Sequence, residues 1–537
     1  MKEESPIYKT KIGREITIAP IYENTDSETT FNWTIDGKSI CTTSTLTFSA
    51  DEAGRYFILI SATNAGGTTE KEIRIDVFQL DVPTISIADA DKGFKVLQGS
   101  ELTITPIVDS FLETSYSWQI NGEDISNELT CTLPTIELGE YQVRFATHNE
   151  DGDDEVTFKV EVCSPDQVDF NWTFLQTEYN MSAGRTIRIK PVDVNNALDA
   201  VYTWTVDNEQ VQSGENDTYL FTSEQQGEHT VKVEMKNSYI LATQTLKVNV
   251  CPPAGTYQRK ISATSSASMN KVYEYLPAPG QFINENHNTT TMAEACTYAE
   301  ERINQTAYVS LGGFGGYIIV GFDHSIVNDG DYNIAITGNA FDGSSEPGIV
   351  WVMQDENGDG LPNDTWYELR GSEYGKAETW QDYAVTYHKP SGIQLPTPWT
   401  DNHGQSGSID YLGAFHRQDY YYPAWVKEKQ YTLRGTRLKE RNYDQSGNGT
   451  YWVNDSYEWG YADNFSAIDR LTDDDNYNAG PSDNHFKISH AVTFDGKDAN
   501  LKYVDFIKVQ VGVNSKSGWL GEISTEVFGI KDFNMIK

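Results

Sequence analysis

Short runs in which apolar and polar residues alternate fill the first half of the chain. Residues 31–37 (FNWTIDG) recur as residues 116–122 (YSWQING) and again as residues 202–208 (YTWTVDN). A period of two is the pattern of a strand with one buried face. Each run ends in Asp-Gly, Asn-Gly or Asp-Asn, which tolerate positive φ, so each predicts a tight hairpin.

A second landmark follows each Trp-bearing run. The three copies are Gly54-Arg-Tyr56, Gly139-Glu-Tyr141 and Gly227-Glu-His229, and an alternating strand follows each of them. A Trp on one strand packed against a later Tyr-bearing strand fills the centre of a two-sheet sandwich, so we predict core positions for the tryptophans. The third copy has His229 in place of tyrosine, and the tyrosine-corner hydrogen bond is not predicted there.

These repeats resemble the immunoglobulin-like domains of the PKD type, which carry Gly-x-Tyr followed by a strand that ends in Asn. The resemblance implies β-sandwich domains at residues 1–78, 79–163 and 164–251. Such sandwiches are usually spacers or general interaction modules. Residues 252–537 form a fourth and larger domain.

The last domain has a different texture, with dense Tyr and Trp and short strand signals bounded by Gly, Asn, Asp or Pro. The strand signals are residues 317–322, 331–336, 348–353, 384–387 and 504–511. Residues 290–302 start at Thr and are rich in helix formers, so they predict a helix. The whole chain therefore predicts an all-β fold, three tandem Ig/PKD-like β-sandwiches followed by a larger β-sandwich or jelly-roll domain.

Charge excludes some partners. The chain has 40 basic and 79 acidic residues and a formal charge of −39, so nucleic acid and anionic membrane surfaces are poor partners. No apolar run approaches the roughly 18 residues that span a bilayer. The start, MKEES, looks like a mature polypeptide whose signal has been removed. We therefore expect a secreted protein, with any lipid-anchoring Cys upstream of this chain.

The five cysteines are Cys41, Cys131, Cys163, Cys251 and Cys296. None has a spacing that suggests zinc, and the number is odd. We predict buried or partly buried free thiols. A single disulfide between Cys251 and Cys296 is the alternative.

An acidic loop in the last domain has the spacing of a calcium site. Oxygen-bearing side chains alternate along the loop, and Gly360 follows where the chain must turn sharply. The predicted Ca²⁺ ligands are Asp355, Asn357, Asp359, the Leu361 carbonyl, Asn363 and Asp364. Trp366 stands where an EF-hand has its bidentate Glu, so this is not an EF-hand. A solvated turn without metal is the alternative, and a structural role for the ion is favoured over a catalytic one.

Signals for catalysis are weak. Residues 312–316 (GGFGG) lack the Lys-Ser/Thr ending of a phosphate-binding loop and predict an inter-strand turn. Glycoside hydrolysis needs two positioned acids, and the candidates are Glu346, Glu368, Glu373 and Glu522. Chance pairs are expected in so acidic a chain, and hydrolase motifs are missing. We predict a protein that is not an enzyme.

Aromatic patches are the better lead to a ligand, because Trp and Tyr faces hold sugar rings and planar molecules. The predicted ligand-binding residues are Trp399, His403, His416, Tyr420, Tyr421, Trp425, Tyr451, Trp452 and Trp459. On an alternating strand, residues 420–422 cannot all point inward, so at least one ring is predicted to be exposed. The two histidines are candidate ligands of a metal centre. Packing in the domain core is the alternative for each aromatic residue, and an ordinary surface position is the alternative for each histidine.

The last domain also resembles a C-terminal domain of "cell surface protein" lipoproteins of Bacteroidota. The matching segments are residues 275–284, 311–324, 346–350, 366–374 and 518–522. This resemblance implies an outer-membrane uptake locus and capture of vitamin B12 (a cobamide) beside a TonB-dependent transporter. We therefore expect a surface-exposed, non-catalytic ligand-capture lipoprotein. A glycan-binding module or adhesin is one alternative, and a glycoside hydrolase is another.

Overall fold

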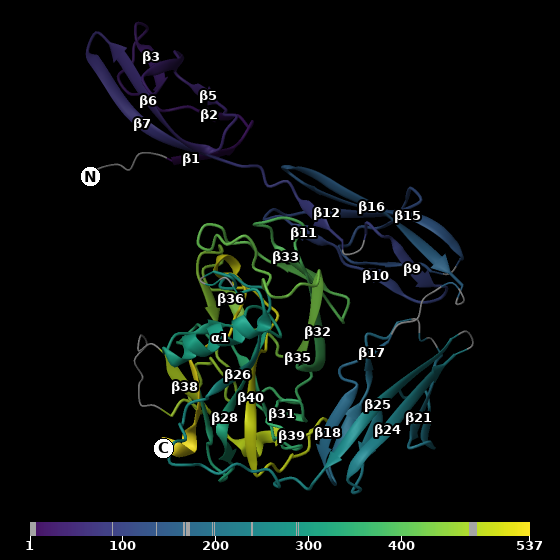
Figure 1. Ribbon diagram of the computed structural model, residues 1–537. Coiled ribbons are helices and arrows are strands. Elements are labelled where there is room, and N and C mark those ends of the chain that lie inside the picture. The colour runs from purple at the N-terminus through teal and green to yellow at the C-terminus, as the bar shows by residue number, and fades with distance from the viewer. Residues whose placement is uncertain are drawn as a thin grey trace. The chain divides into compact units, whose positions relative to one another are not determined.

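The protein is described here from a computed structural model, shown in Figure 1. It describes residues 7–87, 90–135, 137–164, 167, 172–195, 197, 199–237, 240–285, 287, 289–471 and 481–537. The regular structure of the described residues is almost all β-strand, with one α-helix, α1 (Met292–Asn304), in the last domain. The all-β prediction with Ig-like sandwiches is confirmed.

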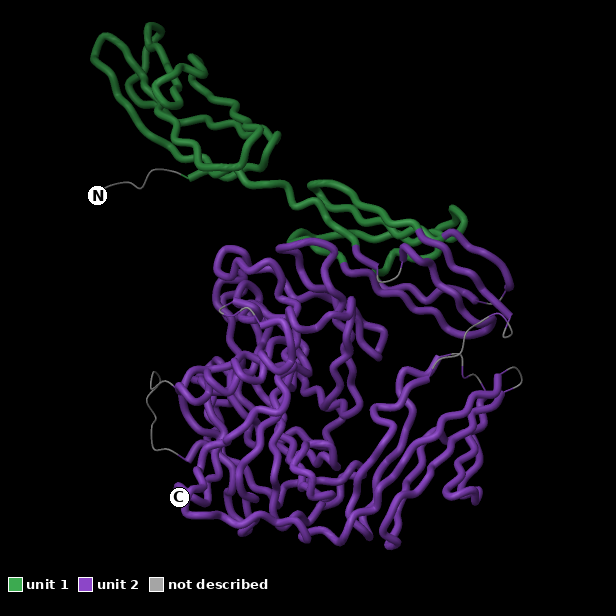
Figure 2. The backbone as a smooth tube through the Cα atoms, in the orientation of Figure 1, with its two compact units in different colours: residues 1–85, 108–129, 143–157 green, residues 86–107, 130–142, 158–537 purple. Residues whose placement is uncertain are grey.

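The chain divides into two compact units, coloured in Figure 2. Unit 1 comprises residues 1–85, 108–129 and 143–157, and unit 2 comprises residues 86–107, 130–142 and 158–537. The first repeat lies in unit 1, and the third repeat and the terminal domain lie in unit 2. The second repeat contributes segments to both units.

The first repeat is a sandwich of a five-stranded sheet, in the order β1-β7-β6-β3-β4, and the pair β2–β5. Its strands are β1 (Ile7–Lys11), β2 (Ile16–Ile18), β3 (Thr30–Ile35), β4 (Lys38–Cys41), β5 (Leu46–Phe48), β6 (Gly54–Asn64) and β7 (Gly67–Phe78). Trp33 is fully buried between the sheets, as predicted, and its indole nitrogen donates to the Thr43 carbonyl at 2.8 Å.

The second repeat has the same order of elements. Its strands are β8 (Thr84–Ser86), β9 (Phe94–Leu97), β10 (Leu102–Ile104), β11 (Ile107–Asp109), β12 (Ser115–Ile120), β13 (Glu123–Ser126), β14 (Cys131–Leu133), β15 (Gly139–Asn149) and β16 (Gly152–Cys163). Trp118 on β12 pairs with Phe145 on β15 and is fully buried. Its indole nitrogen donates to the Glu128 carbonyl at 2.9 Å.

The third repeat has a five-stranded sheet in the order β18-β25-β24-β21-β22, and the pairs β17–β20 and β19–β23. Its strands are β17 (Thr173–Phe174), β18 (Glu178–Ser182), β19 (Thr186–Ile189), β20 (Pro191–Val192), β21 (Val201–Val206), β22 (Glu209–Gly214), β23 (Tyr219–Thr222), β24 (Gly227–Lys236) and β25 (Leu241–Cys251). Trp204 is fully buried here as well, but its indole nitrogen has no hydrogen-bond partner among the described residues.

The corner hydrogen bond occurs in all three repeats. The hydroxyl groups of Tyr56 and Tyr141 each donate to the carbonyl four residues earlier, at 2.9 Å. In the third repeat the Nε2 atom of His229 contacts the Gln225 carbonyl at 3.0 Å, and Nδ1 contacts Asp207 at 2.7 Å. An imidazole nitrogen therefore takes the place of the tyrosine hydroxyl, a substitution that the sequence pattern did not predict.

The terminal domain has a six-stranded sheet in the order β26-β28-β40-β30-β31-β39, a three-stranded sheet (β38-β29-β42) and a four-stranded sheet (β34-β33-β32-β35). The strands are β26 (Lys271–Leu276), β27 (Val309–Ser310), β28 (Tyr317–Val327), β29 (Ile334–Gly338), β30 (Gly348–Met353), β31 (Trp366–Leu369), β32 (Trp380–His388), β33 (Thr397–Asp401), β34 (Ser406–Ile409), β35 (Gln430–Arg437), β36 (Asn442–Asp444), β37 (Trp452–Asn454), β38 (Ser482–Phe486), β39 (Ala491–Val492), β40 (Tyr503–Val511), β41 (Glu526–Val527) and β42 (Gly529–Asp532). All three sheets contribute to one hydrophobic core.

Helix α1 begins where the sequence predicted a Thr start. Thr291 is the N-cap, and its side chain accepts from the Glu294 nitrogen while the Glu294 side chain accepts from the Thr291 nitrogen. This capping box satisfies two amide groups that a helix start leaves free. The buried face of the helix packs against β26, as Figure 1 shows.

Residues 312–316 form the predicted turn between β27 and β28. Gly312 has φ +69, and a Cβ atom there would lie 2.1 Å from the Ala278 carbonyl oxygen, so only glycine fits. All five cysteines are free thiols, so the alternative disulfide between Cys251 and Cys296 is not formed.

Candidate ligand-binding cleft and acidic loop

The acidic loop connects β30 to β31 and is held by its own side chains. The Asp355 carboxylate accepts from the amides of Gly358 at 2.8 Å and Gly360 at 3.1 Å. The Asp359 carboxylate accepts from the side-chain amides of Asn357 at 2.9 Å and Asn363 at 2.8 Å. The loop side chains thus bind one another around a turn with two positive-φ glycines. The carboxylate oxygens of Asp355, Asp359 and Asp364 do not come within 4.8 Å of one another as a group.

Three carboxyl groups of the loop region are buried: Asp355, Glu356 and Asp364. Burial is the largest cause that raises the pKa of Asp364 to about 8, and the nearby Glu356 and Asp355 carboxyl groups act in the same direction. The Asp364 Oδ1 atom has no hydrogen-bond donor among the described residues. A buried carboxylate oxygen without a partner is costly in free energy, and a cation at this oxygen would remove the cost.

The loop also joins the third repeat to the terminal domain within unit 2. Ser182 on β18 donates to the Glu356 carboxylate at 3.0 Å, and the Asn180 amide donates to the Asn363 carbonyl at 3.2 Å. Nearby, the Arg185 guanidinium donates to the Ala499 carbonyl at 3.0 Å. Figure 1 shows β18 beside β31 and β39 at this joint.

A cleft of about 670 Å³ opens beside the joint, between the third repeat and the terminal domain. Two ion pairs connect its walls. Arg188 pairs with Asp382 at 2.8 Å, and Arg434 pairs with Asp193. The described residues that line the cleft include apolar and aromatic side chains of the third repeat, namely Leu175, Tyr179, Ile187, Pro191 and Val192. The size lies within the range of roughly 300–1,000 Å³ that is usual for ligand pockets.

Lys508, Trp351 and Trp366 are part of the terminal-domain wall. The Lys508 ammonium lies 4.7 Å from the ring centre of Trp351, 5.3 Å from that of Trp366 and 5.7 Å from that of Tyr317. Trp351 pairs with Lys508 across β30 and β40, so the two side chains stand on the same face of the sheet. Burial lowers the pKa of Lys508 to about 8, although the Glu274 and Glu368 carboxyl groups oppose the change.

Most of the predicted aromatic ligands do not meet at one surface. Tyr421 and Trp425 are buried in the hydrophobic core, and Tyr420 and Trp399 are half-buried against it. Residues 420–422 do not form a strand, and both Tyr421 and Tyr422 are buried. The expected alternation therefore does not apply to this segment, because loop backbone has no fixed side-chain period.

The remaining predicted residues are dispersed over the domain. His403 is exposed and stacks on Trp380, with ring centres 4.2 Å apart, whereas His416 contacts Glu285 at 2.6 Å. Tyr451 is exposed, Trp452 packs against Gly518, and Trp459 lies beside His490 and lines a separate cavity of about 240 Å³.

Sequence reasoning missed the cleft residues Trp351, Trp366 and Lys508. The available signal was the position of Trp351 within a predicted strand, where the period of two shows which residues share a face. The candidate hydrolase acids Glu346, Glu368, Glu373 and Glu522 are absent from the residues that line the cleft, although Glu368 pairs with Trp351 of its wall. Glu373, for example, pairs with Lys376 at 2.9 Å and with Arg441 at 3.0 Å.

Comparison with known proteins bears on the repeats. Residues 1–64, 82–149 and 154–237 match the model of the PKD-like domain. The repeats are PKD-like. No curated protein matches this chain. The helix of the described residues is too short to cross a membrane.

Solved structures similar to this chain include an I-band fragment of titin, with 14% identity over 47% of this chain and 97% of that one, at a TM-score of 0.23. Fibronectin(III)-like modules of CbhA from Clostridium thermocellum match with 16% identity over 33% and 100%, at 0.18. SGBP-B of Bacteroides ovatus, solved with a mixed-linkage heptasaccharide, matches with 12% identity over 95% and 96%, at 0.19. At these scores the matches give no basis for assigning a ligand.

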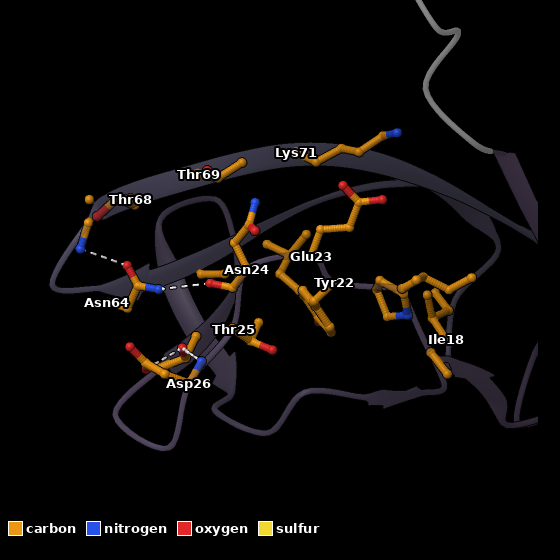
Figure 3. A pocket seen from close by; sticks show the side chains of 18 of the residues that line it. Ile18, Tyr22, Glu23, Asn24, Thr25, Asp26, Asn64, Thr68, Thr69 and Lys71 are labelled. Atoms are coloured by element: carbon orange, nitrogen blue, oxygen red, sulfur yellow. Dashed lines mark hydrogen bonds between the residues drawn. The ribbon is translucent and has the colours of Figure 1, made fainter.

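The first PKD-like repeat has an open groove of about 960 Å³ at one end, shown in Figure 3. All three repeats share an Ile-x-Pro-Ile/Val segment, and in the third repeat Pro191–Val192 pairs with β17. The corresponding Pro20–Ile21 has no strand beside it among the described residues, and Ile21 is 96% exposed.

Proposed function

We propose that this protein is a non-catalytic capture protein of the cell surface, and that it binds its ligand in the cleft between the third repeat and the terminal domain. The observation that carries the proposal is the cleft wall, where the Lys508 ammonium lies beside the rings of Trp351 and Trp366. Such a wall offers aromatic faces for stacking and charged groups for hydrogen bonds. The third PKD-like repeat forms the opposite wall of the cleft. A lipid anchor upstream of this chain would hold the protein at the outer membrane.

A glycan is the ligand class that the cleft supports best. Sugar rings combine apolar faces with hydroxyl groups, and the lining pairs Trp351 and Trp366 with the polar side chains of Arg434, Asp382 and Asn402. The volume of about 670 Å³ suits a short oligosaccharide.

A cobamide, handed on to a TonB-dependent transporter, is the second candidate. One observation favours it: His403 is exposed and directly follows Asn402 of the cleft lining, and a neutral imidazole is the commonest metal ligand in proteins. A cobamide is larger than a drug-sized ligand, so the cleft would enclose only part of it.

The acidic loop supports this function as a joint. We propose that Ca²⁺ binds at Asp355, Asn357, Asp359, Leu361, Asn363 and Asp364. The partnerless Asp364 oxygen and the all-oxygen donor set fit this ion. Because the loop contacts Asn180 and Ser182 of the third repeat, the ion would fix the width of the cleft.

Calorimetric titration of the full chain tests the ligand. The probes are neutral pentasaccharides of glucose, xylose and mannose, and cyanocobalamin. We expect one class to bind, and Trp366→Ala to weaken that binding at least tenfold, which is about 1.4 kcal/mol. Trp519→Ala is the matched control, because Trp519 is 50% exposed and does not line the cleft. Equal affinity in both variants would place the ligand elsewhere.

A further inference from the structure

Three carboxyl groups meet inside the terminal domain, away from the acidic loop. Glu346 precedes β30, Asp463 follows β37, and Glu526 begins β41. One carboxylate oxygen from each residue lies within 4.8 Å of one oxygen of each of the other two. Among the described residues, this is the group of acids, histidines or cysteines that is close enough to share a metal ion. We call these three residues the acid triad.

The acid triad is enclosed. Asp463 is 1% exposed and Glu526 is 4% exposed, while Glu346 is half-buried. No described Lys, Arg or His side chain forms an ion pair with any of the three. Two unit charges about 4 Å apart repel by roughly 4 kcal/mol at an effective dielectric constant near 20, so three bare carboxylates here would be strongly unfavourable.

Backbone amides stabilise only part of this charge. Asp463 accepts from the amides of Asn339 at 2.8 Å, Ala340 at 2.9 Å and Glu526 at 2.9 Å, so both of its oxygens are oriented by the main chain. Glu346 accepts from the Ser524 amide at 3.4 Å. The Glu526 Oε1 atom, in a side chain more than nine-tenths buried, has no donor among the described residues.

The donor set selects the kind of partner. All three ligand groups are carboxylates, with no imidazole or thiolate, so the set suits a hard cation and not zinc or copper. Ca²⁺ takes oxygens at 2.3–2.6 Å, and two oxygens on opposite sides of one ion are therefore up to about 5 Å apart. The observed limit of 4.8 Å is compatible with a single shared ion.

We propose that Glu346, Asp463 and Glu526 bind one Ca²⁺ ion, which ties together three chain segments that are far apart in sequence. The ion would neutralise the triad and provide the missing partner of the Glu526 oxygen. This site is distinct from the acidic loop and does not depend on the proposed ligand. Its role would be to stabilise the terminal domain in a calcium-rich extracellular medium.

Protons are the competing explanation. Burial and the neighbouring carboxyl groups raise the pKa of Asp463 to about 8, and burial raises the pKa of Glu346 to about 7. Protonated groups could therefore share hydrogen bonds at neutral pH without an ion. The two explanations differ in the effect of added Ca²⁺, which is what the experiment measures.

The experiment uses the full chain after prolonged dialysis against a chelator, because a buried ion leaves slowly. Calorimetry with Ca²⁺ alone gives the number of sites, and thermal unfolding gives the stabilisation. The test variant is Glu526→Gln, which keeps the shape and removes one charge. The matched control is Glu378→Gln, the same change at an exposed carboxylate of the terminal domain.

We expect Glu526→Gln to bind one Ca²⁺ equivalent fewer than the parent and Glu378→Gln to bind as many as the parent. In chelator, Glu526→Gln should melt higher than the parent, because repulsion within the triad falls. With Ca²⁺ the order should reverse. If Glu526→Gln keeps every Ca²⁺ equivalent of the parent, or if the parent binds none, the triad holds protons and the proposal fails.

Discussion

Glu368 offers a sharp test of the electrostatics of the cleft wall. It lies on β31 across from Trp351, is 6% exposed, and accepts a hydrogen bond from the Thr436 hydroxyl at 2.5 Å. Burial raises its pKa from 4.5 to about 7, although the Thr436 hydrogen bond and the Lys508 charge both oppose the change. The perturbation is Glu368→Gln, which is neutral at every pH and can still accept from Thr436.

A carboxyl group with a raised pKa in the folded state favours the protonated form. Its contribution to stability is fully present below pH 4.5 and is lost as the pH rises toward 7. At about 1.4 kcal/mol per pKa unit, the loss amounts to about 3 kcal/mol at pH 8. Glu368→Gln escapes this loss, so it should be more stable than the parent at pH 8 and similar to it at pH 5.

The assay is unfolding in urea, monitored by hydrogen exchange of peptides from β30 and β40. These peptides report the terminal domain separately from the repeats. We predict that the stability difference between variant and parent grows by about 3 kcal/mol from pH 5 to pH 8. A difference that is the same at both pH values would refute the reasoning. It would mean that Glu368 is already ionised in the folded protein at pH 5.

Further predictions concern the repeats, the loop and the cleft walls. Trp204→Phe should lower the free energy of unfolding by about 1 kcal/mol less than Trp33→Phe, because only Trp33 has an indole hydrogen bond to lose. Hydrogen exchange measured in each repeat would show the difference. Millimolar Ca²⁺ should raise the melting temperature of the terminal domain. The rise should be smaller in Asp364→Asn than in the parent, and equal to that of the parent in the exposed control Asp455→Asn. Arg188→Asp should destabilise by less than about 1 kcal/mol but weaken ligand binding, and adding Asp382→Arg should restore the binding.

Local patterns carried much of the fold. The period of two, the Asp-Gly and Asn-Gly turns and the Thr cap of the helix are each set by a few neighbouring residues. The structure accordingly places Trp33, Trp118 and Trp204 in sandwich cores and starts α1 at Thr291. The His229 corner was missed because an imidazole can make the same hydrogen bond as a phenol.

The candidate sites needed contacts that no local pattern encodes. In the cleft, Arg188 of the third repeat pairs with Asp382 of the terminal domain, and Lys508 belongs to the same lining. The acid triad brings together residues 346, 463 and 526. Loop aromatics such as Tyr421 and Tyr422 have no fixed period, so their burial depends on tertiary packing. Sequence could therefore nominate residue types for a site but could not say which of them meet.

The most direct test of the central claim is the affinity of the cleft for its ligand, measured by calorimetry in matched tryptophan variants. The account predicts that a pentasaccharide or cyanocobalamin binds the parent chain, that Trp366→Ala binds it at least tenfold more weakly, and that Trp519→Ala binds it as the parent does. A loss of affinity in Trp519→Ala with full affinity in Trp366→Ala would contradict the account.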